Sequence, residues 1–129
     1  MYEVDTLSDL RSVVKEALQD IEDVTVLDYT ESRFSTPAAI VAPSQPYIVR
    51  GNTFNGYTVR VDVIVLPGKG NTYAIAMEMD RLVEAVLHAT QEYDLVEVSA
   101  PDEVTIASAG TFWGTIITLE FNTTFKEVM

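Results

Sequence analysis

The segment Gly68-Lys69-Gly70-Asn71-Thr72 lies between a strand-like and a helix-like stretch, where phosphate-binding loops of nucleotide-binding proteins are found. Such a loop needs the spacing G-x-x-x-x-G-K-[ST], in which the lysine follows a glycine and precedes a hydroxyl residue. Here Gly70 follows Lys69, so that spacing is absent. We interpret the segment as a strand-to-helix turn.

His88 is the only histidine, and the chain has no cysteine. A two-histidine metal site, a histidine relay, a cysteine-ligated zinc and a disulfide are therefore excluded within one chain. His88 falls near the end of a helix-like segment, where a cation suits the negative end of the helix dipole. The sequence therefore predicts no catalytic residue, no metal and no cofactor.

Carboxylates form two clusters, Asp20 with Glu22 and Asp23, and Asp102 with Glu103. A carboxylate hydrolase needs two such groups in one pocket, with pKa values moved apart by their surroundings. Both clusters lie at the ends of predicted elements beside turn-like residues, and the spacing of a calcium-binding loop is absent. We interpret them as solvated surface.

The composition indicates one globular domain over residues 1–129, since 47% of the residues are hydrophobic and 22% are charged. The net charge is −12, and the eight basic residues stand singly, so the chain should repel nucleic-acid phosphates. Residues 1–12 carry charges and lack the apolar core of a signal peptide. No apolar run approaches the roughly 18 residues of a membrane span. We therefore expect no membrane contact.

Hydrophobic periodicity predicts two helices and several strands. The strand over 57–66 is the clearest element, because Tyr57 and the valines that follow at every second position share one face. In chain order we expect a helix over 7–21, strands over 24–27 and 38–42, a continuation or hairpin arm at 47–49, the strand over 57–66, a helix from 71 or 72 to about 89, and strands over 103–107 and 112–125. This order predicts an α+β fold, with one twisted, mostly antiparallel β-sheet and two α-helices packed on one face.

The middle of the chain resembles the tail terminator proteins of long-tailed bacteriophages, the minor tail protein U-like group. The residues that carry the resemblance are Pro37-Ala-Ala-Ile-Val-Ala-Pro43, Phe54, the strand Tyr57-Thr-Val-Arg-Val-Asp-Val-Ile-Val-Leu66, and Met79-Asp80-Arg81-Leu82. The segment Ala109-Gly-Thr-Phe-Trp-Gly114 with Ile116-Ile-Thr-Leu-Glu-Phe121 is similar to the closing strands of that family. The resemblance covers most of the chain in the order of its elements, and residues 37–86 in residue pattern.

The resemblance implies a structural virion protein and no enzyme: a homo-hexameric ring that caps the tail tube, stops its growth and joins tail to head. Its partners would be its own copies, the tail-tube protein on one side and a head-closure or connector protein on the other. DNA would pass through the ring without specific binding, and assembly would take place in the host cytoplasm. For subunit contacts we expect Arg33 and Phe34 in one loop, and Arg50 and Phe54 in the turn 50–56, because basic residues of an acidic chain suit a neighbour's carboxylates.

Two other functions remain open. One is another component of the same junction, such as a head-closure, connector or tail-tube protein. The other, from a different class, is a small enzyme or ligand-binding domain on the sheet face away from the helices. Its polar side chains would come from Arg60, Asp62, Thr118 and Glu120. A pocket that encloses these four residues would favour the ligand-binding function, and an open face would favour assembly.

Overall fold

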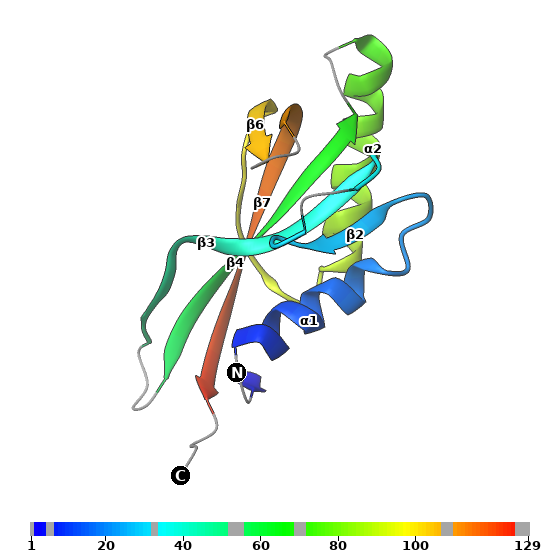
Figure 1. Cartoon of the computed structure of the whole chain (residues 1–129). Coiled ribbons are helices and arrows are strands. Elements are labelled where there is room, and N and C mark those ends of the chain that lie inside the picture. The colour runs from blue at the N-terminus through cyan, green and yellow to red at the C-terminus, as the bar shows by residue number, and fades with distance from the viewer. Residues whose placement is uncertain are drawn as a thin grey trace.

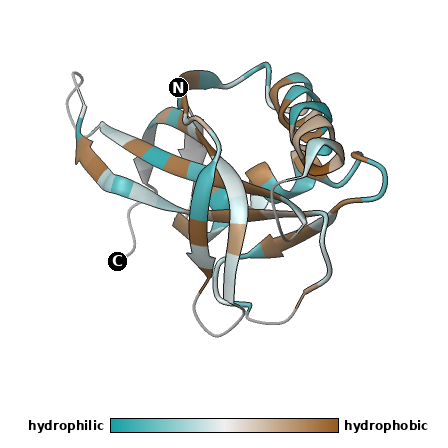
Figure 2. Cartoon of the chain, turned by 90° about the horizontal axis from the view of Figure 1, so that it is seen from above, coloured by the Kyte–Doolittle hydropathy of each residue, from teal (hydrophilic) through white to brown (hydrophobic). Residues whose placement is uncertain are grey.

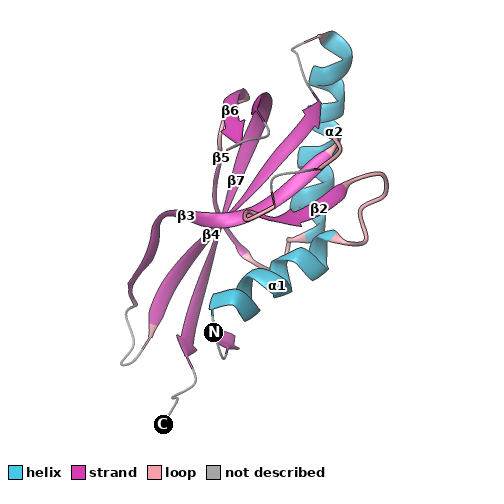
Figure 3. Cartoon of the chain, viewed as in Figure 1, coloured by secondary structure: helices cyan, strands magenta, loops and turns pink. Residues whose placement is uncertain are grey.

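The alternating segment that the sequence predicts over 57–66 is the central strand of the molecule. The computed structural model describes residues 2–4, 7–31, 34–51, 56–68, 72–106 and 110–125. Their elements are, in chain order, β1 (Tyr2–Val4), α1 (Leu7–Leu18), β2 (Thr25–Asp28), β3 (Ala38–Arg50), β4 (Tyr57–Gly68), α2 (Tyr73–Ala89), β5 (Asp94–Val98), β6 (Asp102–Ile106) and β7 (Gly110–Phe125). The strands form one twisted sheet with both helices on one face, which confirms the predicted α+β fold (Figure 1; Figure 3).

The sheet has the order β1-β7-β4-β3-β2, so β4 lies between β3 and β7 and pairs antiparallel with both. Two pairings are parallel, β1 with β7 and β2 with β3. The long strand β7 is paired on both edges over most of its length. Along one edge it pairs with β4, and along the other it pairs in turn with β6, β5 and β1.

The main core lies between β4 and the helices. The four valines of β4 at odd positions, Val59, Val61, Val63 and Val65, are buried on this face. The remaining buried members come from the helices, from neighbouring strands and from the segment after α2: Leu10, Val14, Leu18, Ala39, Val41, Met79, Leu82, Val86, Tyr93, Ile117, Leu119 and Phe121. Figure 2 shows hydrophobic and hydrophilic bands that alternate along the strands, as a sheet covered on one face requires.

A second, smaller core lies on the opposite face of the sheet, at the end where β6 pairs with β7. Its buried members are Leu27, Ile40, Leu66 and Phe112. Ile64 packs against them, so the far end of β4 is apolar on both sides because both sides are covered there. This confirms the sequence pattern at Ile64 and Leu66.

Both helices begin and end for local reasons. In α2, the hydroxyl of Thr72 accepts a hydrogen bond from the backbone N–H of Ile75, so Thr72 is the N-cap, and the helix starts where the sequence predicts. Helix α1 ends at Leu18, three residues before the predicted end at Ile21. The chain turns there, and Asp23 adopts the left-handed conformation with φ 61°, which a continuing helix does not allow.

Two strands are absent from the sequence prediction. The three residues of β1 pair with residues 123–125 of β7, a contact between segments that lie far apart in the chain. Strand β5 has no alternating pattern because all five of its side chains are exposed.

The predicted strand over 38–42 and the segment 47–49 belong to one strand. This strand, β3, runs from Ala38 to Arg50, and its register with β4 shifts between Pro43 and Ile48.

Thr115 carries the first testable prediction, because its buried hydroxyl oxygen has no hydrogen-bond partner. Its side chain is 2% exposed and its cross-strand partner is Val65 of the main core. An unsatisfied buried polar group costs about 1–3 kcal/mol, so Thr115→Val should raise the free energy of unfolding by about 1 kcal/mol. Urea denaturation measures this change.

Thr118 provides the matched control on the same strand, since its hydroxyl donates a 2.7 Å hydrogen bond to Asp62 Oδ1. Thr118→Val should lower the free energy of unfolding by about 1 kcal/mol, because the carboxylate then loses a partner. Equal losses of stability in both variants would contradict the claim that the buried Thr115 hydroxyl has no hydrogen-bond partner.

Candidate functional site

The four residues expected at subunit contacts have different surroundings. Arg33 and Phe54 lie outside the described residues. Phe34 is half-buried and packs on the second core, with its ring centroid 5.5 Å from that of Phe112. Arg50 is exposed at the end of β3, and its guanidinium carbon lies 5.4 Å from the ring centroid of Tyr57.

The structure does not bring Phe34 and Arg50 together. Phe34 contacts β7 at Phe112, whereas Arg50 pairs with Tyr57, which pairs with Thr123 at the other end of β7. At about 3.3 Å per strand residue, Phe112 and Thr123 are roughly 35 Å apart. If both residues contact other subunits, they do so at opposite ends of the sheet.

The polar residues of the open sheet face do lie together, in a ladder across β4 and β7. Thr58 Oγ1 donates to Asn122 Oδ1 at 3.0 Å, and Thr118 Oγ1 donates to Asp62 Oδ1 at 2.7 Å. Between these pairs, Arg60 Nε lies 3.9 Å from Glu120 Oε2. The four residues named for a ligand-binding function are therefore adjacent, and each has its partner directly across the strand pair.

Pairing of this kind leaves the ladder little capacity for catalysis. Each carboxylate already has a partner of its own, and no described hollow is lined by the four residues. Among the described residues, no group of three His, Asp or Glu side chains could hold a metal ion. The ladder thus fastens β4 to β7; Thr58 and Thr118 are buried within it, whereas Arg60 and Glu120 are half-buried.

A broad hollow of about 680 Å³ lies where the carboxyl ends of α1 and α2 meet. Its lining residues are Ala17, Asp20, Ile21, Glu22, Arg81, Ala85, His88, Ala89 and Glu92. His88 occupies the last turn of α2, as the dipole argument predicts. Within the described part of the chain, no side-chain hydrogen bond or ion pair of His88 is seen.

Arg81, on the rim of this hollow, forms an ion pair with Glu78 one turn earlier in α2. The hydrogen bond from the guanidinium lowers the pKa of Glu78 below its usual value, and the same bond raises the pKa of Arg81. Both groups are largely solvated, so this pair stabilises the surface of the helix only weakly.

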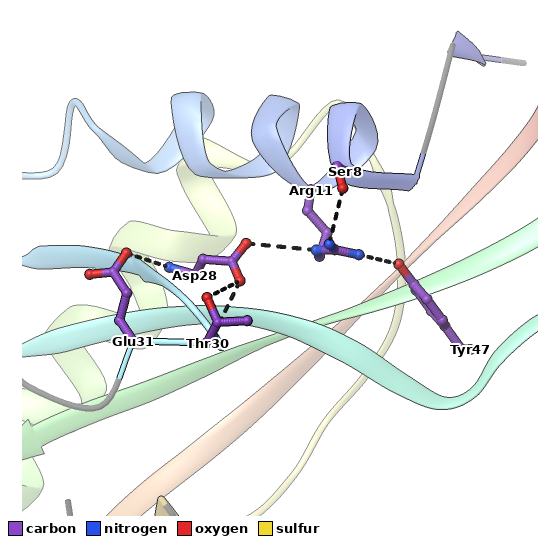
Figure 4. Close-up of polar contacts among 6 residues, drawn as sticks. All are labelled: Ser8, Arg11, Asp28, Thr30, Glu31 and Tyr47. Atoms are coloured by element: carbon purple, nitrogen blue, oxygen red, sulfur yellow. Dashed lines mark hydrogen bonds and ion pairs between the residues drawn. The ribbon is translucent and has the colours of Figure 1, made fainter.

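Arg11 of α1 connects the helix layer to the sheet where β3 leaves the core (Figure 4). Its Nη1 donates to the hydroxyl of Tyr47 at 2.5 Å, and its Nε lies 3.7 Å from Asp28 Oδ2. The guanidinium carbon also lies 5.3 Å from the ring centroid of Tyr29. One cation thus holds α1, the end of β2 and the second half of β3 together.

Asp28 is itself fixed by the turn that follows β2. Its carboxylate accepts hydrogen bonds from the backbone N–H and the hydroxyl of Thr30, while its own N–H donates to Glu31 (Figure 4). Sequence reasoning missed this cluster. A lone arginine beside the apolar stripe of an acidic chain was the available signal, but nothing in the pattern identifies Tyr47 as its partner.

Exposed apolar side chains gather on two strands. On β3 they are Ile48 and Val49, at 37% and 40% exposure, in the segment Tyr47–Arg50 that we call the arm. On β5 they are Leu95, Val96 and Val98, at 50%, 37% and 38%. Figure 1 shows the β3–β4 hairpin projecting away from the helices. Such surfaces typically mark contacts with another protein.

No protein-family model and no curated protein sequence matches this chain. In the described part of the chain, no helix is long and apolar enough to cross a membrane.

The Arg11 cluster leads to a prediction about stability. Arg11 is only 14% exposed, so Arg11→Met keeps the aliphatic stem but leaves Asp28 and Tyr47 without their partner. We expect the free energy of unfolding to fall by about 2 kcal/mol, because hydrogen bonds to charged groups contribute about 1.5–3 kcal/mol. Thermal or urea unfolding measures the change.

Lys15 offers a matched control one turn later in the same helix. Lys15→Met removes the same charge without breaking a described contact, and should change stability by no more than about 0.5 kcal/mol. If the Lys15 variant loses as much free energy of unfolding as the Arg11 variant, the cause is the change in net charge. That result would contradict a stabilising role for the Arg11 contacts.

Proposed function

We propose that this chain is a structural subunit of a bacteriophage virion, one copy of a ring that caps the tail tube, stops its growth and joins tail to head. The ring form and the phage setting come from the resemblance of residues 37–86 to tail terminator proteins. A stoichiometry of six comes from the same resemblance.

The observation that carries the assembly part of this proposal is the arm. Ile48 and Val49 are successive residues, so their side chains point to opposite faces of the strand, and both are exposed. A strand with apolar side chains exposed on both faces has too little of its own domain to cover it. A neighbouring subunit would supply the missing cover.

The open sheet face supports assembly rather than catalysis. From the sequence, a pocket that encloses Arg60, Asp62, Thr118 and Glu120 would favour ligand binding. An open sheet face would favour assembly. The four side chains pair with one another, and the hollow at the carboxyl ends of α1 and α2 is lined by other residues. Side chains that pair across two strands, rather than enclose a hollow, favour assembly over ligand binding.

The charge of the chain fits a channel for DNA. At −12 per copy, a ring of several copies carries a large negative charge, and phosphates would find no attractive site on its inner wall. DNA could then move through the bore without pausing. Acidity also favours solubility, so the net charge fits a DNA channel but is not specific to one.

The proposal predicts the phenotype of a phage that carries an early stop codon in the gene for this chain. Electron microscopy of the lysate should show overlong tails without heads, because nothing ends the growth of the tube. Tails of normal length beside filled heads would indicate a connector role instead. Normal virions would refute a role in the neck.

A second prediction concerns the turn 50–56. The double variant Arg50→Glu, Phe54→Ala should fold, since Arg50 is exposed, but it should reduce ring or virion assembly at least about tenfold, through like-charge repulsion on an acidic neighbour. Lys15→Glu on α1 makes the same change of charge away from the turn and should assemble normally. Normal assembly of the double variant would show that this turn is not a contact surface.

A further inference from the structure

We propose that neighbouring copies of this chain join edge to edge: the arm of one copy pairs, antiparallel, with β5 of the next. This inference deepens the proposed function and rests on its claim that the chain forms a ring. It names the two surfaces that meet, whereas the sequence predicts only the contact residues Arg33, Phe34, Arg50 and Phe54.

The outer edge of the arm is free to accept a strand. β2 pairs only with residues 38–41 of β3, so no described strand covers the outer edge at Tyr47–Arg50. The N–H of Gly51 donates to the carbonyl of Gly56 across the hairpin, and backbone groups alternate in direction along a strand. The N–H and C=O groups of Ile48 and Arg50 therefore point outward, to the free edge.

Strand β5 presents the complementary edge at the other margin of the sheet. Its inner edge pairs with residues 117–120 of β7, and no described strand pairs with its outer edge. The N–H of Ser99 donates to the carbonyl of Ile116, so the backbone groups of the preceding residue, Val98, point away from β7. Exposed edges of this kind tend to pair with another strand unless the protein protects them.

The two edges complement each other in charge as well as in apolar surface. β5 carries Asp94 and Glu97 and no basic residue, and all of its side chains are exposed. The arm ends in the exposed cation Arg50. Pairing would bury Ile48 and Val49 against Leu95, Val96 or Val98, and would place the arginine near the two carboxylates.

Strand direction is consistent with a closed ring. β3 is antiparallel to β4, β4 to β7, and β7 to β5, so β3 and β5 run in opposite directions within one copy. Rotation about an axis along the strands preserves these directions from copy to copy. The arm and the β5 of the next copy would therefore meet antiparallel, and a head-to-tail contact of this type generates a ring when the rotation between copies closes.

The two edges cannot satisfy each other within one copy. β4 and β7 lie between β3 and β5 in the sheet, which separates the strands by three spacings of about 4.8 Å, and the free edges face away from each other. A second copy of the chain can supply a partner strand for each of these edges.

Engineered disulfides test the contact, since the chain contains no cysteine. The double variant Val49→Cys, Val96→Cys, oxidised at high protein concentration, should give a ladder of covalent multimers on a non-reducing gel. Ile48→Cys with Val98→Cys samples a second register. The matched control is Val49→Cys with Glu84→Cys on the exposed face of α2. It should give at least about tenfold less covalent multimer, because the proposed contact does not bring its two thiols within bonding distance.

Failure of this inference can be distinguished from failure of the proposed function. If neither cysteine pair exceeds the control, while the stop-codon phage still makes overlong tails, the edge contact is wrong and the terminator role stands. If the ladder forms but the stop-codon phage makes normal virions, the contact is right and the phage role is wrong.

A charge at the edge provides a second measurement. Val96→Lys should reduce multimer mass by light scattering, or incorporation into virions, at least about fivefold, since an edge lysine blocks strand pairing. The control variant Glu84→Lys, on α2, should leave both the multimer mass and the incorporation into virions unchanged. Unaltered assembly of the Val96 variant with normal thermal unfolding would overturn the proposal.

Discussion

The fold depends on the burial of one strand, β4, between two antiparallel neighbours and beneath two helices. Val59, Val61, Val63 and Val65 are at most 1% exposed. Burial of each stabilises the fold by about 1.5–3 kcal/mol relative to an exposed valine. The apolar stripes of α1 and α2 are buried against this strand and its neighbours, and the second core covers the opposite side of its far end. Strand β7, its neighbour, is likewise paired on both edges and contributes buried side chains to both cores.

The surfaces proposed for assembly are those that this central packing leaves uncovered. The sheet is longer than the helices that cover it, so the β3–β4 hairpin extends beyond them (Figure 1). The short strands β6, β5 and β1 complete the far edge of β7, but nothing described covers β5 in turn. Arg11 holds the base of the arm through Tyr47, which fixes the direction in which the hairpin leaves the core. The central packing that stabilises the fold and the surfaces proposed for assembly thus belong to different parts of one continuous sheet.

The sequence predicts those elements whose side chains alternate between core and solvent, which is why β4 and α2 are correct. It does not predict β5, where all side chains are exposed and no period exists. It also misses the partners that arise from distant pairing. Alternation places Arg60 and Glu120 on the open face, but only the register makes them neighbours. For the same reason Phe34, expected at a subunit contact, packs on Phe112 of its own chain, while its role between subunits stays a prediction.

Immunogold labelling of virions with antibodies against this chain tests the central claim most directly. The account predicts label at the junction of head and tail, with none along the tube and none at its distal end. Label distributed along the tube would make the chain a tube subunit. Virions without label, from a phage that expresses the chain, would contradict the claim that it is a structural part of the particle.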